Sequence, residues 1–135
     1  MNRERGASSL ILALLILMLG SLLLQGVNQQ QASYASRVAT QSLAIQRQAL
    51  VQSALEWGRG QLWSGVAEME CWRYSSSGAR VCLWRLSGDE VVMAAHYDGM
   101  TLWRLGNVIQ GTIVFSSHGW SDFCPLKEVA LCRIP

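Results

Sequence analysis

The chain has 135 residues and a formal net charge of +2, from 11 basic and 9 acidic residues. Charges of both signs are scattered along it, which argues against a basic surface for nucleic acid, and we expect no nucleic-acid partner. Once the apolar N-terminal segment is set aside, roughly a hundred residues remain, which is enough for one small domain.

The N-terminal segment carries the strongest signal in the sequence. No charged residue occurs over residues 6–36, and residues 7–24 form an apolar run. About 18 such residues are long enough to cross the hydrocarbon core of a membrane as a helix. The competing interpretation is a cleaved secretory signal, whose apolar core usually has only about 7–15 residues and is followed by a small-residue cleavage site. We therefore predict a retained transmembrane helix over residues 7–27.

The charges that flank this helix predict its orientation. Arg3 and Arg5 precede it, whereas Asn28 and three glutamines follow it. Short tails rich in arginine or lysine stay on the cytoplasmic side of a membrane. We therefore expect a cytoplasmic N-terminus and a C-terminal domain on the opposite side.

The residues after the apolar run predict a continuing helix over residues 28–63. They are rich in glutamine, alanine, leucine and arginine, which are good helix formers. Small and apolar residues at helical spacing form a stripe from Ala32 to Trp57, and the later part of this stripe is suited to packing on a domain. A break near Gly20 or Gly26 is an open alternative.

A β-rich domain is expected over residues 64–135, because short β-prone runs alternate there with turns that contain glycine and serine. The expected strands are residues 69–74, 80–86, 91–97, 101–105 and 108–115. Asp98-Gly99 predicts a two-residue hairpin turn, since both positions tolerate a positive φ. Gly106-Asn107 is expected to separate the last two strands.

The first two expected strands place two cysteines side by side. A four-residue turn over residues 75–78 sets Cys71 opposite Cys82, at a separation that a disulfide can span. The same register opposes Arg73 to Arg80, which is unfavourable for two like charges. The register therefore favours a Cys71–Cys82 bond, and a twist of the hairpin could relieve the repulsion.

The other two cysteines, Cys124 and Cys132, are then left to close a C-terminal loop. Four cysteines in a segment that faces an oxidising compartment are typical of two disulfides. Their spacing lacks the close Cys-x2–4-Cys pairs of zinc sites, so we expect no metal.

Catalytic signals are weak. The two histidines are His96, within an expected strand, and His118, next to Ser117. Adjacency in sequence does not make a nucleophile–base pair. The chain also lacks phosphate-binding and metalloprotease motifs. We therefore expect neither catalysis nor a cofactor.

The six tryptophans invite an interface hypothesis. Trp84 shares a strand face with Cys82 and is expected in the core. Trp120 is expected in a loop, which makes it a candidate for contact with a partner. Packing of Trp120 over the loop between Cys124 and Cys132 is an equally open alternative.

Several of these segments resemble one family. Gly6 followed at once by Ala7-Ser8-Ser9-Leu10-Ile11 and a long apolar helix is similar to a type IV prepilin leader. Two further motifs resemble the YgdB-like prepilin-type proteins of enteric bacteria. They are Gly20-Ser21-Leu22-Leu23-Leu24-Gln25-Gly26 and Gly119-Trp120-Ser121-Asp122-Phe123-Cys124-Pro125-Leu126-Lys127-Glu128. The resemblance covers nearly the whole chain.

The resemblance implies a processing step and a fold. Residues 1–6 would be a leader that a prepilin peptidase removes by cutting after Gly6, and Ala7 would then be N-methylated. The implied fold is α+β and pilin-like, with a long N-terminal helix, transmembrane and then amphipathic, packed on a small antiparallel sheet with disulfide-closed loops. The protein would be a single-pass protein of the inner membrane, with residues 28–63 and 64–135 in the periplasm.

Two departures from the family pattern narrow the implied function. Ala7 stands where the family usually has Phe or Met, and Ile11 stands where it usually has Glu. The family's tip subunit shares this missing carboxylate. The resemblance therefore implies a minor pilin or pseudopilin that helps initiate or cap a type IV pilus or a type II secretion pseudopilus, together with other such subunits.

A non-polymerising protein is the alternative. Ile11 would then be an ordinary lipid-facing residue, and the chain would be a single-pass inner-membrane protein with a periplasmic binding or quality-control domain.

Overall fold

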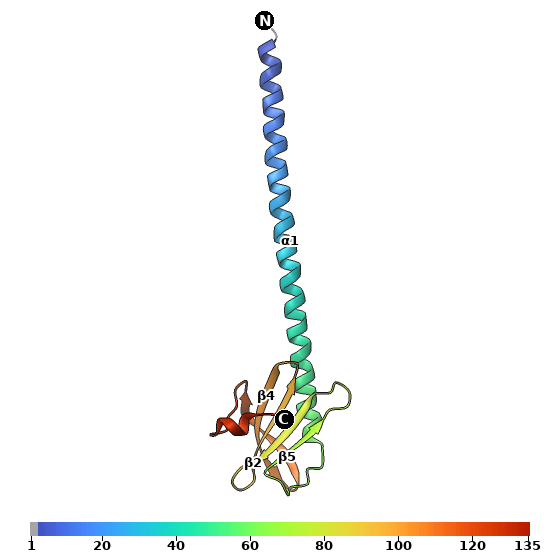
Figure 1. Ribbon diagram of the computed structural model, residues 1–135, viewed down its shortest axis with the longest axis vertical. Coiled ribbons are helices and arrows are strands. Elements are labelled where there is room, and N and C mark those ends of the chain that lie inside the picture. Colours follow the sequence, from blue (N-terminus) through green and yellow to red (C-terminus); the bar gives the residue numbers. More distant parts are fainter. Residues whose placement is uncertain (1–2) are drawn as a thin grey trace. The chain divides into compact units, whose positions relative to one another are not determined.

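The structure, a computed structural model, describes the backbone of residues 3–135 and the side chains from residue 6 onward. Residues 1 and 2 of the expected leader, and the side chains of residues 3–5, lie outside the described part. The elements in chain order are α1 (Arg3–Arg59), β1 (Met69–Arg73), β2 (Arg80–Arg85), β3 (Glu90–Tyr97), β4 (Met100–Ile109), β5 (Thr112–Ser121) and the 3-10 helix η1 (Val129–Cys132) (Figure 1).

The five strands form one antiparallel sheet in the order β1-β2-β3-β4-β5, so each strand pairs with its neighbour in sequence. The last turns of α1 pack on one face of this sheet, and two disulfides close the hairpin and the C-terminal loop. The predicted α+β, pilin-like fold is therefore confirmed.

Helix α1 is continuous through both glycines at which a break was an open alternative, Gly20 and Gly26. It ends at Arg59, about one turn before the predicted end at residue 63. The indole Nε1 of Trp63 donates a hydrogen bond to the carbonyl oxygen of Gly58 at 2.9 Å. Trp63 thus satisfies one of the free carbonyls at the helix end from outside the helix.

The chain divides into two compact units, one ending at Leu43 and the other beginning at Ala44. The described part of the first unit consists of α1 up to Leu43, and its apolar side chains are exposed. The second unit contains the last turns of α1 and the whole sheet, and it holds the hydrophobic core.

In the second unit, α1 contributes three fully buried side chains to this core: Val51, Ala54 and Leu55. They pack against buried side chains from one face of the sheet, namely Ala79, Val81, Leu83, Val91, Met93, Ala95, Leu102 and Ile113. The predicted stripe is only partly correct, because Val51 and Leu55 lie outside it and Ala32 is exposed.

Gly58 lies where the backbone of α1 comes close to side chains of the sheet. A Cβ atom on Gly58 would lie 2.6 Å from Cγ1 of Val81 and 3.1 Å from Sδ of Met93. The absent side chain of Gly58 lets the helix backbone reach the sheet.

The register of the β1–β2 hairpin is the predicted one. Cys71 pairs with Cys82, and Arg73 lies opposite Arg80. The guanidinium of Arg80 donates a hydrogen bond to the carbonyl oxygen of Pro135, which directs this charge toward the C-terminal segment. The two like charges are therefore not held against each other.

The β3–β4 turn is also the predicted one. Asp98 and Gly99 have φ values of 46° and 78°. Both residues thus adopt the positive φ that a two-residue hairpin turn of this type requires.

The prediction for the last two strands is wrong. Strand β4 runs through Gly106 and Asn107 to Ile109, and the turn lies at Gln110 and Gly111, whose φ values are 51° and 77°. Gly106 is needed for a close approach: a Cβ there would lie 2.6 Å from the carbonyl oxygen of Val114 on β5.

Candidate functional site

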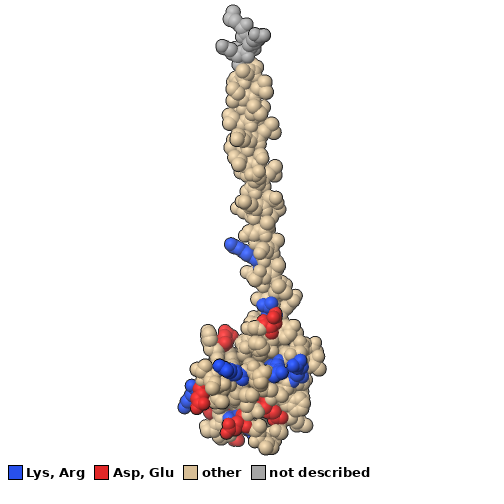
Figure 2. Space-filling view, in the orientation of Figure 1, with Lys and Arg blue, Asp and Glu red and all other residues tan. Residues whose placement is uncertain are grey.

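The N-terminal helix is the first candidate site. α1 contains an 18-residue window with a mean hydropathy of 2.6, long and apolar enough to cross a membrane. Its surface over residues 6–36 carries no Lys, Arg, Asp or Glu, as the tan stretch in Figure 2 shows. Gly6, Ala7 and Ile11 all lie in this part of α1, and Ile11 is 59% exposed. The residues expected for processing are therefore contiguous with the apolar stretch.

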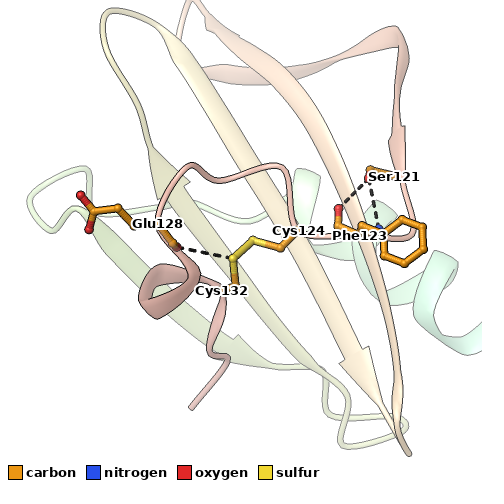
Figure 3. The surroundings of a disulfide bond; sticks show 5 residues. All are labelled: Ser121, Phe123, Cys124, Glu128 and Cys132. Atoms are coloured by element: carbon orange, nitrogen blue, oxygen red, sulfur yellow. Dashed lines mark hydrogen bonds between the residues drawn. A yellow bond between two sulfur atoms is a disulfide. The ribbon is translucent and has the colours of Figure 1, made fainter.

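Both expected disulfides are present. Cys71 and Cys82 join neighbouring positions of β1 and β2, with Cα atoms 4.1 Å apart. Cys124 and Cys132 close a C-terminal loop, with Cα atoms 5.8 Å apart (Figure 3). We call residues 122–135, which contain this loop, the C-terminal strap.

The C-terminal strap covers the face of the sheet that α1 leaves free. Five buried residues form a second cluster on this face: Cys82, Trp84, Val92, Ala94 and Trp103. The rings of Trp84 and Trp103 lie 5.1 Å apart within it, and Trp84 is only 3% exposed, as predicted for a core residue. Strap side chains pack against the cluster: Cys124, Leu126, Cys132 and Ile134.

Trp120 does not lie in a loop, so that prediction is wrong. It is a residue of β5, it pairs with Arg104 on β4, and it is 46% exposed. The guanidinium carbon of Arg104 lies 4.1 Å from the centroid of the Trp120 ring and 4.2 Å from that of Phe115. Its ring stacks on Arg104, which also contacts Glu56 of α1, so Trp120 lies on the α1 side of the sheet and is not packed over the strap.

Arg104 connects this aromatic pair to α1. Its Nη1 lies 3.1 Å from Oε1 of Glu56, whose other oxygen lies 3.0 Å from Nε of Arg59. The Arg104 side chain is only 13% exposed. Burial lowers the pKa of Arg104, the charge of Glu56 raises it, and the charge of Arg59 lowers it. Arginine nevertheless stays protonated at physiological pH.

The sequence pattern does not predict this cluster. Glu56 and Arg104 are 48 positions apart, and no local pattern connects them. The alternation of β4 could place Arg104 on the same face as Leu102, but the partner on α1 depends on how the helix lies across the sheet.

A shallow groove of about 330 Å³ lies between the β2–β3 turn and the C-terminal strap. Its lining combines apolar, polar and charged residues: Leu86, Ser87, Glu90, Pro125, Leu126, Lys127, Glu128 and Leu131. The strap also presents Phe123 and Val129, which are 83% and 84% exposed. The strap is thus a second candidate surface for contact.

The two histidines lie on strands β3 and β5. Nδ1 of His96 lies 2.7 Å from Oγ1 of Thr101, which pairs with it across β3 and β4. His118 lies in β5, next to Ser117 along the strand. Among the described residues, no group of three or more His, Cys, Asp or Glu side chains is placed to hold a metal ion.

Comparison with known proteins gives one match. Residues 15–132 match a family model described as "Protein of unknown function (DUF2509)". No curated protein and no solved structure matches the chain. The matched part includes both disulfides and the whole sheet but begins after Gly6, Ala7 and Ile11. Because the match extends over most of the sequence, the chain belongs to the DUF2509 family.

Proposed function

We propose that this chain is a minor pilin-like subunit that helps initiate or cap a type IV pilus or a type II secretion pseudopilus. The observation that carries the proposal is the helix. It is free of charge over residues 6–36, directly after Gly6, and it continues without a break to Arg59. One element can therefore serve as membrane anchor and, at its other end, as part of the core of the domain.

The proposed cut after Gly6 fits this arrangement. A peptidase that acts there would remove the charged tail and leave the apolar stretch intact on the new N-terminus at Ala7. The retained helix would hold the subunit in the inner membrane before assembly and join neighbouring subunits after it. Partner choice would fall to the periplasmic domain.

Ile11 supports a position at the end of an assembly. A charged N-terminal amine in an apolar environment is costly unless an opposite charge meets it. The side chain of Ile11 is apolar and offers no acid to the amine of a neighbouring subunit. Such a subunit suits the end of an assembly, where no further subunit needs a carboxylate for its N-terminal amine.

Processing gives the first test. We expect N-terminal sequencing to find a chain that begins at Ala7 when the prepilin peptidase is co-expressed, and one that begins at Met1 when it is not. A bulky residue before the cut should block the reaction, so Gly6→Val should stay uncut. Gly20→Val is the matched control: nothing lies within 4 Å of a Cβ at this position, and it should be processed normally. Met1 as the first residue in every sample would contradict the proposal.

Assembly gives the second test. We expect the wild-type chain to co-purify with co-expressed minor pilins and to be sparse in sheared filaments. Ile11→Glu should raise its share along the filaments, whereas Ile11→Leu should not. A chain that is processed but never recovered with other subunits would indicate a non-polymerising anchored domain.

A further inference from the structure

The face of the sheet opposite α1 depends on one short segment for its cover. The buried cluster around Trp84 and Trp103 is overlaid by strap residues, and the side chains that reach it include both half-cystines of the strap, Cys124 and Cys132. This cover is therefore coupled to the state of one disulfide.

The backbone of the strap is weakly tied. Outside helices and strands, the backbone hydrogen bonds of the described residues include one within the strap, from Leu131 N to Glu128 O at 3.0 Å. Side-chain hydrogen bonds hold its ends: Ser121 Oγ donates to the Phe123 carbonyl at 2.6 Å and accepts from Phe123 N at 3.1 Å, and Arg80 donates to the Pro135 carbonyl. Between these ends, apolar contacts and the disulfide keep the strap closed.

The two disulfides differ in how a thiol can reach them. Both Cys124 and Cys132 are partly exposed, and each can be approached from solvent. In the other pair, Cys71 is also partly exposed, on the edge strand β1, but Cys82 is fully buried and lies on a strand that is paired on both sides. Strand pairing also holds Cys71 and Cys82 together, so a broken bond between them would tend to re-form.

A buried donor beneath the strap has no acceptor. Nε1 of Trp84 has no hydrogen-bond partner among the described protein atoms. A buried N–H group without an acceptor destabilises the arrangement that buries it. Loosening of the strap would let this group reach water or a carbonyl oxygen, which favours the open arrangement.

We propose that the Cys124–Cys132 disulfide is a thiol–disulfide exchange site and that its reduction by a dithiol loosens the C-terminal strap from the Trp84–Trp103 face. One thiolate of the dithiol attacks a strap sulfur, the S–S bond breaks, and the other strap cysteine leaves as a thiolate. The second thiol of the dithiol then displaces the first strap sulfur. The dithiol is thereby oxidised to a disulfide, and the strap disulfide is reduced. The strap gains two electrons and, after protonation, two thiols.

The first experiment measures the order of reduction. The full chain in detergent micelles is treated with increasing dithiothreitol, alkylated with N-ethylmaleimide, and digested for mass spectrometry. We expect Cys124 and Cys132 to be alkylated at least about tenfold faster than Cys71 and Cys82, because both strap cysteines are partly exposed, whereas Cys82 is buried and strand pairing holds Cys71 beside it. Equal rates, or earlier reduction of Cys71–Cys82, would overturn the proposal.

The second experiment measures the opening by hydrogen exchange. Loop-closure entropy for cysteines 8 residues apart corresponds to a shift on the order of 50-fold in the equilibrium between closed and open strap. We therefore expect the Leu131 amide, which donates to the Glu128 carbonyl within the loop, to exchange faster by about this factor after selective reduction, while the amides of β2 and β3 keep their protection. Unchanged strap exchange, or loss of protection throughout the sheet, would overturn the proposal.

A matched pair of double variants gives the control. Cys124→Ser with Cys132→Ser should show fast strap exchange without reductant and no response to dithiothreitol. Cys71→Ser with Cys82→Ser should keep slow strap exchange and remain responsive. If either pair fails to fold, the titration of the wild-type chain still decides the question.

These measurements do not depend on the proposed function. An uncut chain that forms no filament can still show the predicted order of reduction. Conversely, a processed subunit that joins a pilus can lack the predicted order of reduction.

Discussion

Gly58 and Gly60 stand two positions apart at the end of α1, yet only one of them has a packing role. A Cβ on Gly58 would meet Val81 at 2.6 Å, whereas the nearest atom to a Cβ on Gly60 is the Trp57 carbonyl oxygen at 3.5 Å. Small-to-large changes in packed sites cost about 1–3 kcal/mol. The higher helix propensity of alanine offsets about 1 kcal/mol of that cost inside a helix.

We therefore expect Gly58→Ala to lower the free energy of unfolding by up to about 2 kcal/mol, measured by denaturant titration of the full chain in micelles. Gly60→Ala should change it by less than about 0.5 kcal/mol. Equal effects at the two positions would show that the helix does not approach the sheet at Gly58.

Arg104 gives the second prediction for a single residue. Its planar guanidinium stacks between Phe115 and Trp120, and a lysine ammonium cannot stack in this way. We expect Arg104→Lys to lower the free energy of unfolding by about 1 kcal/mol. The matched control is Arg73→Lys, at an exposed position on β1, which should be close to neutral. A loss of the same size at both positions would remove the packing role assigned to Arg104.

The same cluster changes how Trp120 is interpreted. Its ring contacts Arg104 through one side and is 46% exposed, so part of its surface remains free for a partner. A residue that is both a packing element and a contact candidate must be tested for stability and binding together. Loss of binding with a matching loss of stability would not identify a docking residue.

At the scale of elements, the turn between β4 and β5 is the most informative. Gly111 has a φ of 77° and nothing lies within 4 Å of a Cβ there, so alanine would suffer only the backbone penalty. We expect Gly111→Ala to lower the free energy of unfolding by about 1–2 kcal/mol. Gln110→Asn should be neutral or stabilising, since asparagine tolerates positive φ better.

Gly106→Ala completes this comparison, because its Cβ would lie 2.6 Å from a backbone oxygen that cannot move alone. We expect Gly106→Ala to be the most destabilising of the three changes in the same denaturant titration. A neutral Gly106→Ala would contradict the close approach of β4 to β5, and a neutral Gly111→Ala would contradict the turn at Gln110-Gly111.

Much of the sheet could be predicted from local chemistry. Asp98-Gly99 requires only two residues that accept positive φ, and the register of Cys71 opposite Cys82 follows from counting back from one turn. The turn predicted at Gly106-Asn107 was wrong because a glycine permits both a turn and a close approach of two strands. Which of the two occurs at Gly106 depends on β5. The position of Trp120 within β5 was not predicted for the same reason, because it depends on pairing with another strand.

The helix could be predicted in extent but not in its contact face. Uncharged, helix-forming sequence indicated one long element, and the structure differs by about a turn at the C-terminal end. The predicted stripe does not include the buried residues Val51 and Leu55, because it was fitted to the whole segment from Ala32 to Trp57. Only the last turns face a sheet, so a shorter window describes that packing better.

On the scale of the whole molecule, the two compact units suggest where the chain can be divided. The unit that begins at Ala44 keeps Val51, Ala54 and Leu55, which cover one face of the sheet. We expect a fragment of residues 44–135 to be soluble and to unfold cooperatively, as followed by circular dichroism. A fragment of residues 60–135 lacks this cover and should aggregate, because it exposes a continuous apolar face. Similar behaviour of the two fragments would contradict the assigned core.

The strand order has a consequence for how the chain folds during synthesis. Because every strand pairs with its neighbour in sequence, each pairing closes a short loop, and hairpins of this kind form in about 1–10 μs. Val51, Ala54 and Leu55 leave the ribosome before any strand does. The sheet can therefore condense, hairpin by hairpin, on a helix that has already been synthesised.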